Sequence, residues 1–389
     1  MSKIDLIATT AFGLESIVAN ELKSLGYENL QIQNGRVSFQ AGTEAVARCN
    51  LWLRSADRVL LKMGEFEACT FDELFEQTKK LPWTDWLPES AEFPVEGKSI
   101  QSQLFSVSDC QAIVKKAIVE KMKEKYPRQW FQENGPRYKI QVGMLNNVAT
   151  LTMDTSGAGL HKRGYRKLSG EAPLKETLAA ALVYISRWRA DRPLIDPCCG
   201  SGTIPIEAAL IGRNIAPGLN REFAAEKWPE LSMKIWQKAR EEAKDSILKQ
   251  QTLGIMGFDI DGSVLDLARY HAKLAGLEKA VSFQRQDVSD LRSQYHYGYL
   301  ITNPPYGERL SEKTEVEKLY RTMGAVLKNM KTWSSYILSS HPQFEKHFRR
   351  KADKRRKLYN GRIQCNYYQF YGPKPDNMVG PFATINPVD

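Results

Sequence analysis

The chain has 389 residues, of which 42% are hydrophobic and 26% are charged, and 55 Lys and Arg against 45 Asp and Glu give a net charge of +10. The composition excludes a disordered chain, and the length allows two or three globular domains. The positive net charge favours a polyanionic partner over a small neutral substrate.

The cysteines and the N-terminus narrow the class of protein further. No two of the six cysteines form a C-x-x-C pair, which argues against a zinc site, and nothing suggests a disulfide framework in a chain of this length. No apolar run approaches the ~18 residues of a membrane-spanning helix, and the first residues lack the apolar core of a signal peptide. We therefore expect a cytoplasmic protein without a metal site and without membrane contact.

The first 160 residues mix predicted strands and helices without a parallel βαβ rhythm. Apolar residues alternate on both sides of Asn34-Gly35 and of Asn146-Asn147, which predicts two hairpins. Such modules lack a catalytic cluster, so we expect small α+β binding domains. The other predicted elements are strands at 3–9 and 58–66 and helices at 13–25, after Phe71 and at 108–125.

Two basic segments in this region are candidates for RNA contacts. The helix at 108–125 carries Lys115 and Lys116 opposite its apolar stripe, and these could follow a phosphate backbone. The alternative for this helix alone is an ordinary solvated lysine face. The glycine-containing segment 157–166 is interpreted as a linker that also lines the entrance of a site, with Lys162, Arg163 and Arg166 as its basic side chains.

After a predicted helix at 174–188, the stretch D-P-C-C-G-S-G-T begins at Asp196. A short apolar strand, a turn of small residues and a helix start predict the first βα corner of a doubly wound sheet. Gly200 and Gly202 allow close backbone approach to a ligand. The dinucleotide pattern G-x-G-x-x-G is absent, and Asp196 suits a cationic group, such as the α-amino end of S-adenosylmethionine, better than a pyrophosphate.

Two further acids follow predicted strands. Asp259 would accept hydrogen bonds from ribose hydroxyls, and Asp287 could accept one from an adenine amine. The insertion between the first two strands, roughly 214–251, is charged and predicted to be helical after Leu231. Its role is left open.

The motif N-P-P-Y-G begins at Asn303, directly after the apolar strand 299–301. Two prolines stiffen the loop, so that the Asn303 carboxamide and the Pro304 carbonyl could accept the two N–H groups of an exocyclic amine while Tyr306 stacks on its ring. Taken alone, the motif could be a proline-rich turn with a core tyrosine. The upstream nucleotide site favours methylation of a base amine.

The C-terminal part predicts a fifth strand at 333–340 and another at 367–371. Between them lies the densest basic cluster of the chain, at 349–357. Its place after the base-binding motif favours phosphate contacts over a solvated charge run. The residues nominated here are Arg350, Lys351, Arg355 and Arg356.

The combination of D-P-C-C-G-S-G-T and N-P-P-Y-G-E-R-L resembles class I methyltransferases that modify exocyclic amines, and most closely the THUMP-domain RNA methylases. Bacterial 23S rRNA guanine-N2 methyltransferases are the nearest members, and proteins of this kind are also described as N6-adenine-specific DNA methylases. G-L-H-K-R-G-Y-R, A-P-L-K-E-T and L-Y-N-G-R-I-Q-C-N are similar to segments of the same family. The resemblance implies an α/β fold, with a C-terminal Rossmann-like methyltransferase domain built on a mostly parallel seven-stranded sheet and an N-terminal α+β ferredoxin-like and THUMP region.

This resemblance also implies domain limits and site residues. The limits are a ferredoxin-like subdomain at 1–60, a THUMP domain at 61–156, a linker at 157–170 and the methyltransferase domain at 171–389. Asn303, Pro304 and Tyr306 would hold the base. Cys198 stands where the broader class often has glycine, which weakens the case for a backbone contact there. The cofactor-binding residues would be Lys175, Glu176, Thr177, Asp196, Gly200, Gly202, Thr203, Asp259, Ile260, Asp287, Val288 and Asn303.

The function predicted in this way is S-adenosylmethionine-dependent methylation of a guanosine N2 amine, with 23S rRNA preferred over tRNA as the RNA partner. Alternatives are a tRNA guanine-N2 methyltransferase, an N6-adenine methyltransferase acting on DNA or RNA, and a non-catalytic RNA-binding protein with a vestigial cofactor fold. The modified nucleotide and the oligomeric state are left open.

Overall fold

The structure is a computed structural model that describes residues 3–166, 174–249, 252–307 and 313–374. It divides into two compact units, which are treated separately. The N-terminal unit comprises Met1–Thr10, Val18–Leu160 and Arg221–Glu242, and the C-terminal unit comprises Ala11–Ile17, His161–Asn220 and Ala243–Asp389. The predicted linker at 157–170 includes the step from one unit to the other after Leu160, and its residues 167–170 lie outside the described ranges.

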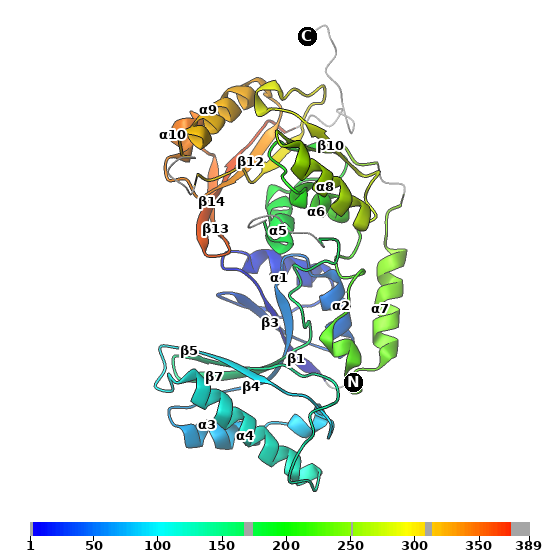
Figure 1. Cartoon of the computed structure of the whole chain (residues 1–389), viewed down its shortest axis with the longest axis vertical. Coiled ribbons are helices and arrows are strands. Elements are labelled where there is room, and N and C mark those ends of the chain that lie inside the picture. Colours follow the sequence, from blue (N-terminus) through cyan, green and yellow to red (C-terminus); the bar gives the residue numbers. More distant parts are fainter. Residues whose placement is uncertain (1–2, 167–173, 250–251, 308–312, 375–389) are drawn as a thin grey trace. The chain divides into compact units, whose positions relative to one another are not determined.

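Seven strands form one continuous sheet in the N-terminal unit, in the order β2-β3-β1-β4-β7-β6-β5 (Figure 1). β4 (Arg58–Glu67) pairs antiparallel with β1 (Ile4–Thr9) at its start and with β7 (Val148–Asp154) along its length. The predicted boundary between 60 and 61 therefore falls inside a strand that belongs to both modules. The remaining strands are β2 (Gln31–Gln33), β3 (Arg36–Ala41), β5 (Val95–Ile100) and β6 (Ile140–Leu145).

Both predicted hairpins are present in this sheet. β2 and β3 pair around Asn34-Gly35, and β6 and β7 pair around Asn146-Asn147. Asn146 and Asn147 have φ values of 50° and 64°, the left-handed pair that a two-residue hairpin turn of type I′ requires. β5 was not predicted because V-E-G-K-S-I lacks an apolar alternation, and it pairs parallel with β6.

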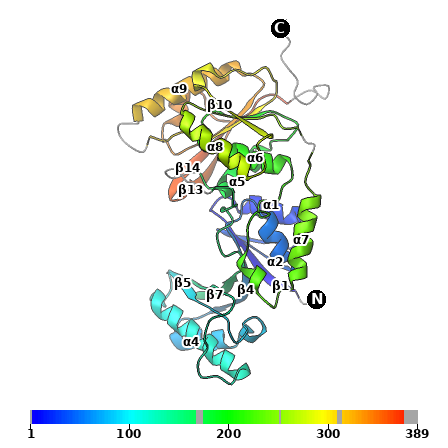
Figure 2. The ribbon, with the colours of Figure 1, turned by 45° about the vertical axis from the view of Figure 1, so that its right-hand side comes forward.

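Helices cover parts of this sheet. α3 and α4 lie on one face of its β4-β7-β6-β5 part (Figures 1 and 2). α3 begins at a capping box, in which Thr70 and Glu73 satisfy each other's backbone N–H groups. The α4 stripe that includes Val114 and Ile118 is buried as predicted. The helices are α1 (Glu15–Ser24), α2 (Glu44–Trp52), α3 (Phe71–Lys79), α4 (Val107–Lys125) and α7 (Met233–Asp245).

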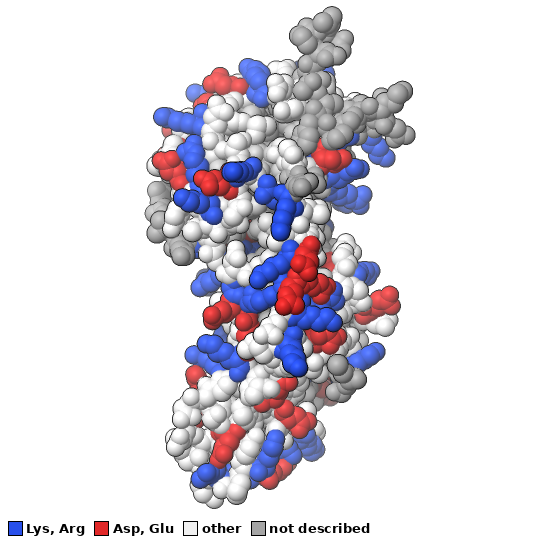
Figure 3. All heavy atoms as spheres, turned by 90° about the vertical axis from the view of Figure 1, so that its right-hand side faces the viewer, with Lys and Arg blue, Asp and Glu red and all other residues white. Residues whose placement is uncertain are grey.

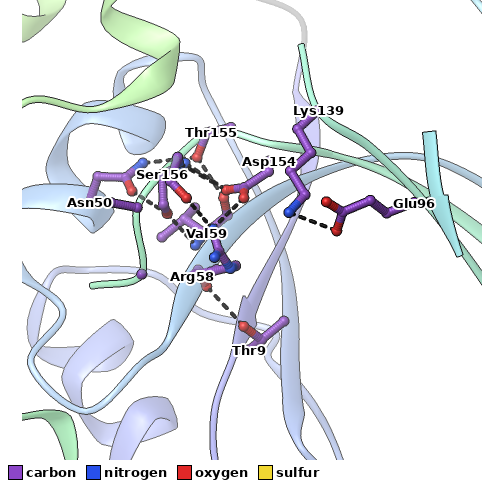
Figure 4. A network of polar contacts seen from close by, with 12 residues as sticks. Thr9, Asn50, Arg58, Val59, Glu96, Lys139, Asp154, Thr155 and Ser156 are labelled. Carbon is purple, nitrogen blue, oxygen red and sulfur yellow. Dashed lines mark hydrogen bonds and ion pairs between the residues drawn. The ribbon is translucent and has the colours of Figure 1, made fainter. Parts of the chain in front are cut away.

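A buried polar network fastens α2 to β4 and to the end of β7 (Figure 4). Asn50 donates to Thr155 Oγ1 at 2.9 Å, and its Oδ1 accepts from Ser156 Oγ at 2.6 Å. Asp154 forms an ion pair with Arg58 and accepts from the Ser156 backbone N–H at 3.0 Å. Because these buried donors and acceptors bind one another, the network stabilises the fold and leaves little for a ligand to bind.

Most of the inserted segment, residues 221–242, packs in the N-terminal unit rather than in the domain to which the sequence assigned it. Trp228 stacks on Tyr138 with ring centroids 4.5 Å apart, and the Tyr138 hydroxyl donates to Glu230 at 2.6 Å. α7 lies beside α2 (Figures 1 and 2), where Arg48 and Glu242 form an ion pair at 2.9 Å. The predicted helix after Leu231 is thus present, and it completes the N-terminal unit.

Seven strands also form the sheet of the C-terminal unit, in the order β10-β9-β8-β11-β12-β14-β13. The first five are parallel, which confirms the predicted mostly parallel sheet. β14 then pairs antiparallel with β12 on one side and with β13 on the other. The chain order reverses between β8 and β11, and ligands of doubly wound folds bind at the carboxyl ends of strands at such a point. The strands are β8 (Leu194–Asp196), β9 (Ile255–Asp259), β10 (Val281–Arg285), β11 (Tyr299–Thr302), β12 (Ser334–Ser339), β13 (Lys354–Asn360) and β14 (Ile363–Phe370).

Helices pack on both faces of this sheet. One apolar layer joins α5, α6 and α8, and the other joins α9 and α10. Within the described ranges, no helix combines the length and the apolar character needed to cross a membrane. The helices are α5 (Glu176–Ser186), α6 (Thr203–Gly212), α8 (Gly262–Leu274), α9 (Lys313–Asn329) and α10 (Phe344–Phe348).

Candidate active site

Four residues predicted as ligands follow neighbouring strands of the C-terminal sheet. In sheet order they are Asp287 after β10, Asp259 at the end of β9, Asp196 at the end of β8 and Asn303 after β11. Parallel strands end at the same edge of a sheet, so the fold brings these four positions together at the point where the strand order reverses.

Asp196 is a buried carboxyl group that pairs with no cationic side chain among the described residues. Its Oδ1 accepts from Thr302 Oγ1 at 2.6 Å and from the Cys198 backbone N–H at 3.2 Å. Burial, assisted by the charge of Asp259, raises the pKa of Asp196 to about 7. A positive charge nearby would restore the ionised form, so this group fits a cationic ligand.

The turn after Asp196 presents backbone to the same edge. Gly202 precedes α6 with a φ of +81°, and a Cβ there would lie 2.8 Å from Phe283, so the position requires glycine. Gly200 has a φ of +50°, and a Cβ there would meet none of the described atoms within 4 Å. The turn therefore leaves open space on its Gly200 side, next to the start of α6 at Thr203.

Asp259 is oriented by backbone N–H groups. Its two oxygens accept from Gly200 at 2.9 Å and from Asp261 at 3.1 Å. Ile260 is 62% exposed, which leaves its apolar side chain able to pack against a ligand ring. A carboxylate has further lone pairs, so Asp259 can still accept hydroxyl donors.

Asp287 is exposed and accepts from the Ser289 N–H at 2.7 Å. Hydrogen bonds from the backbone and side chain of Ser289 hold the pKa of Asp287 below its usual range, so the group is a hydrogen-bond acceptor at neutral pH. Val288 is buried below it in a 3-10 turn. The side chain of Val288 is therefore part of the core, and contact with a ligand would use its backbone.

The start of α5 presents its three predicted residues unequally. Lys175 is exposed, whereas Glu176 and Thr177 are buried. Glu176 forms an ion pair with Arg166 at 3.2 Å. Burial raises the pKa of Glu176 although Arg166 opposes this shift. The Glu176 carboxylate is thus already engaged inside the fold.

The sequence predicted that Arg163 is an exposed side chain that binds RNA, but the structure buries it. It is 3% exposed, and its guanidinium forms an ion pair with the buried Glu207, with Nη2 and Oε2 3.3 Å apart. The Tyr165 hydroxyl donates to the same carboxylate at 3.1 Å. The prediction is wrong for Arg163, because its charge balances Glu207 in the core.

Arg166 is also used inside the C-terminal unit. Besides Glu176, it donates to Thr203 Oγ1 and, at 3.3 Å, to the Leu174 carbonyl. Arg166 therefore links the starts of α5 and α6, and these contacts weaken the case for its predicted RNA contact, which stays a prediction. Lys162, by contrast, is exposed, and its RNA contact stays a prediction.

Asn303 and Tyr306 face each other, because the Tyr306 hydroxyl donates to Asn303 Oδ1. The Tyr306 ring packs against the apolar layer of the C-terminal unit, and burial raises its pKa far above the usual range, so its hydroxyl keeps its proton. Pro304 is buried. One of the two lone pairs of the carboxamide oxygen predicted to receive a base amine thus accepts from a hydroxyl of the chain itself.

The basic cluster at 349–357 is partly engaged. Arg355 forms an ion pair with Glu345, and Arg356 donates to the Gly13 carbonyl and, at 2.9 Å, to Ser16 Oγ. These contacts weaken the predicted phosphate role of Arg355 and Arg356. The exposed side chains of the cluster are Arg349, Arg350, Lys351, Lys354, Arg355 and Lys357.

On α4 the lysines lie among glutamates. Lys115 forms an ion pair with Glu133 at 2.6 Å, and Lys121 and Lys123 pair with glutamates of the same helix. Figure 3 shows one face of the molecule on which Lys and Arg intermix with Asp and Glu. Lys116 is exposed, but the surroundings favour the solvated lysine face over a track for phosphates.

Glu317, His341 and His347 could hold a metal ion by composition, with both Nε2 atoms facing the Glu317 carboxylate at 3.9 and 3.5 Å. However, His341 Nδ1 accepts from the Gln343 N–H at 3.2 Å, and Arg321 Nη2 lies 3.3 Å from His347 Nδ1. In a neutral imidazole the proton is then on Nε2, which leaves no lone pair for a metal there. We interpret the group as a polar triad.

Thr302 and Tyr320 shape the site but were not predicted. Thr302 donates to Asp196, and Tyr320 of α9 donates to the Pro305 carbonyl at 2.8 Å. Thr302 carried a signal, because a hydroxyl ends an otherwise apolar strand directly before Asn303. Tyr320 carried none, because it lies at helical spacing among core residues.

Comparison with known families agrees with this architecture. Residues 163–369 match the family described as RMKL-like, methyltransferase domain. Residues 5–60 match the RlmL ferredoxin-like domain, and residues 68–154 match the THUMP domain.

Individual relatives cover nearly the whole chain. YpsC of Bacillus subtilis (strain 168), a proposed RNA methyltransferase, is 49% identical over 373 residues, which are 95% of this chain and 97% of that protein. A predicted N6-adenine-specific DNA methylase from Listeria monocytogenes is 52% identical, with a TM-score of 0.92 over 96% of this chain and 97% of its own. SMU.472, crystallised with SAH, is 45% identical, with a TM-score of 0.92 over 97% of this chain and 100% of its own. The chain therefore belongs to the RMKL-like methyltransferase family, with a ferredoxin-like and a THUMP domain preceding the methyltransferase domain.

Proposed function

We propose that this protein is an S-adenosylmethionine-dependent RNA methyltransferase that methylates the exocyclic N2 amine of a guanosine, in 23S rRNA rather than tRNA. The observation that carries the proposal is the hydrogen bond from Thr302 to Asp196, which joins the last residue of β11, directly before the N-P-P-Y motif, to the acid at the end of β8. A cofactor site and an amine-binding loop thereby share one edge of the sheet. The family and the SAH complex of SMU.472 support the choice of cofactor.

The residues of the site fit this cofactor. Asp196 would receive the α-amino group, because it is a buried carboxyl group without an ion pair among the described residues. Asp259 would accept from the ribose hydroxyls, Ile260 would pack on the adenine, and Asp287 would accept from the adenine amine. The open side of Gly200 would lie against the ligand. When bound, the cofactor supplies an electrophilic methyl group on a sulfonium.

The amine would be aligned by the loop after β11. Its two N–H groups would donate to Asn303 Oδ1 and to the Pro304 carbonyl, which directs the nitrogen lone pair toward the methyl group. Transfer would form the N–C bond as the S–C bond breaks, with S-adenosylhomocysteine as the leaving group, and the nitrogen proton, acidic once the new bond exists, would pass to water. The amine would replace the Tyr306 hydroxyl on one of the two lone pairs of Asn303 Oδ1. That exchange would free the Tyr306 ring to stack on a flipped base.

RNA as the substrate is supported by the THUMP domain and by the relative YpsC. The name of the Listeria monocytogenes relative supports adenine N6 in DNA as the second candidate. Both amines suit an N-P-P-Y loop, so the acceptor must be identified by experiment.

The test is methylation of RNA from cells that lack this protein, with labelled S-adenosylmethionine and mass spectrometry of the nucleosides. We expect N2-methylguanosine in the 23S fraction, and Asn303→Ala should lower the single-turnover rate at least 100-fold while cofactor affinity stays within a few-fold. Asn329→Ala, at the exposed end of α9, is the matched control and should behave like the wild type. Label in N6-methyladenosine, or in tRNA alone, would overturn the guanine or the 23S assignment respectively.

A further inference from the structure

Building on this proposed transfer, we propose that Tyr320 is a positioning residue for the reaction. Its hydroxyl holds the Pro305 carbonyl and thereby sets the direction in which the preceding Pro304 carbonyl meets the acceptor amine. Tyr320 touches neither cofactor nor base in this proposal, and it acts only through the loop.

The directions of the hydrogen bonds around Tyr320 follow from chemistry. A carbonyl cannot donate, so the Tyr320 hydrogen is committed to the Pro305 oxygen at 2.8 Å. Ser339 Oγ, 3.0 Å from the same hydroxyl, must then donate to Tyr320, and it accepts in turn from the His341 backbone N–H at 3.1 Å. A chain of three hydrogen bonds therefore runs from the corner after β12 to the amine-binding loop, and each bond polarises the next.

The loop has few ways to move once both ends are held. Thr302 is fixed at one end by β11 and by Asp196, and Pro305 is fixed at the other by Tyr320. Between them, the rings of Pro304 and Pro305 remove two of the soft backbone torsions. The ψ angle of Pro304, which aims its carbonyl, is limited by the anchor on Pro305. Without that anchor the peptide plane between the two prolines could rotate.

The surroundings keep Tyr320 in its donor state and in one rotamer. Its side chain is fully buried, and burial raises its pKa well above the usual range, so the hydroxyl stays protonated at any physiological pH. Phe344 and His341 pack edge-on against the ring, with centroids 4.9 and 5.7 Å away. The ring packing would hold the fold even if the hydroxyl were removed, which makes a clean substitution possible.

Tyr320→Phe in the full chain is the test. The variant keeps the ring and loses the anchor on Pro305, so the single-turnover rate of methyl transfer should fall about 10-fold, since a small misplacement of reacting groups costs this much or more. The Kd for S-adenosylmethionine should stay within 2-fold, and so should the KM for RNA. A loss shared equally between kcat and cofactor affinity would contradict a positioning role.

Tyr367→Phe is the matched control. Tyr367 is equally buried on β14, and its hydroxyl donates to the Leu182 carbonyl at 3.0 Å rather than to a carbonyl of the loop. Both variants lose one neutral hydrogen bond and should lower the Tm by similar amounts. Only Tyr320→Phe should slow transfer, and an equal slowing by Tyr367→Phe would mean that the effect is merely structural.

Two further measurements keep the proposal separate from the assumed reaction. Ser339→Ala should slow transfer less than Tyr320→Phe, and the double variant should be no slower than Tyr320→Phe alone, because the chain is already broken. Hydrogen exchange of the Asn303, Tyr306 and Gly307 amides should accelerate at least 5-fold in Tyr320→Phe and not in Tyr367→Phe. Unchanged exchange overturns the role of Tyr320, whereas a wild type that methylates another acceptor overturns only the guanine assignment.

Discussion

Among the residues that the structure describes, each unit buries one aspartate at the end of a strand, and the two are used in opposite ways. Asp154 ends β7 in the N-terminal unit and faces Arg58, with further bonds from backbone N–H groups. Asp196 ends β8 in the C-terminal unit and has a threonine hydroxyl and one backbone N–H as partners. Burial raises the pKa of both, but only Asp154 has a cation opposing the shift.

The difference teaches how to separate a structural acid from a ligand-binding acid. A buried carboxylate with its own cation has little left to offer a ligand, and removing it leaves the cation and the N–H donors unpaired. A buried carboxyl group without a cation is held near its titration midpoint and gains most when a cationic ligand arrives. The predictions below test this comparison.

The largest effect on stability is expected from Asp154→Ala. It leaves Arg58 without its ionic partner and removes the acceptor of the Ser156 and Gly157 N–H groups, so the N-terminal unit should lose about 3 kcal/mol of unfolding free energy. Denaturant unfolding followed by tryptophan fluorescence would measure the loss. Cofactor affinity should not change. A stable Asp154→Ala protein would show that the network of Figure 4 contributes little.

Asp196→Asn should show the reverse pattern. The carboxamide can still accept from Thr302, but the charge that would meet the cofactor ammonium is gone, so affinity should fall by about 1.5–3 kcal/mol. The Tm of the unliganded protein should not fall, since a buried ionisable group has been removed. Calorimetric titration with S-adenosylhomocysteine measures the first quantity. Equal affinity of variant and wild type would remove Asp196 from the cofactor site.

The pH dependence of cofactor binding sharpens the comparison. With a pKa of about 7, Asp196 is roughly nine-tenths protonated at pH 6 in the free protein, and an arriving ammonium lowers this pKa. Binding should therefore release close to one proton at pH 6 and very few at pH 8, and affinity should weaken about tenfold per unit below pH 7. Titrations in buffers of different ionisation enthalpy count the protons, and no release at pH 6 would contradict the raised pKa.

The same raised pKa affects the stability of the unliganded protein. Between about pH 4 and pH 7 the folded state holds a proton on Asp196 that the unfolded chain has lost, so this group lowers stability as the pH rises through that window.

The smallest expected effect is on the salt dependence of RNA binding, and it concerns lysines. A lysine already paired with a glutamate has less to offer a phosphate than an unpaired one. Lys351, Lys354 and Lys357 are exposed, and changing all three to Ala should reduce the log–log salt slope of RNA binding by up to about one unit per lost phosphate contact. The control changes Lys121 and Lys123, which already pair with glutamates, and should leave the slope unchanged. If the two variants behave alike, the cluster at 349–357 does not contact RNA.

Much of the fold could be predicted because its signals are local. The two asparagine-centred hairpins, the α4 stripe and the acids at successive strand ends each depend on a few neighbouring residues. β5 and the continuity of β4 could not be predicted, because they depend on pairing with strands distant in sequence.

The sequence could nominate candidate residues at the ends of strands, but it could not show which side chains pair with one another. The sequence predicts that Arg163 is a basic surface residue, but the fold places the buried Glu207 beside it. The sequence predicts that the Tyr306 ring is free to stack on a base, but in the structure its hydroxyl donates to Asn303 Oδ1. Pairing of this kind is decided by tertiary structure, and sequence spacing carries no signal for it.

The packing of residues 221–242 in the N-terminal unit has a consequence for how the chain is made. When residue 160 has emerged from the ribosome, Tyr138 has been made, but two of its partners have not. These are Trp228, which stacks on the Tyr138 ring, and Glu230, which accepts a hydrogen bond from its hydroxyl. The N-terminal unit therefore cannot finish folding during synthesis until residue 242 has emerged, after the first strand of the methyltransferase sheet. A fragment cut at residue 160 would expose the Tyr138 ring, and an RNA-binding fragment for the laboratory should carry 221–242 on a linker.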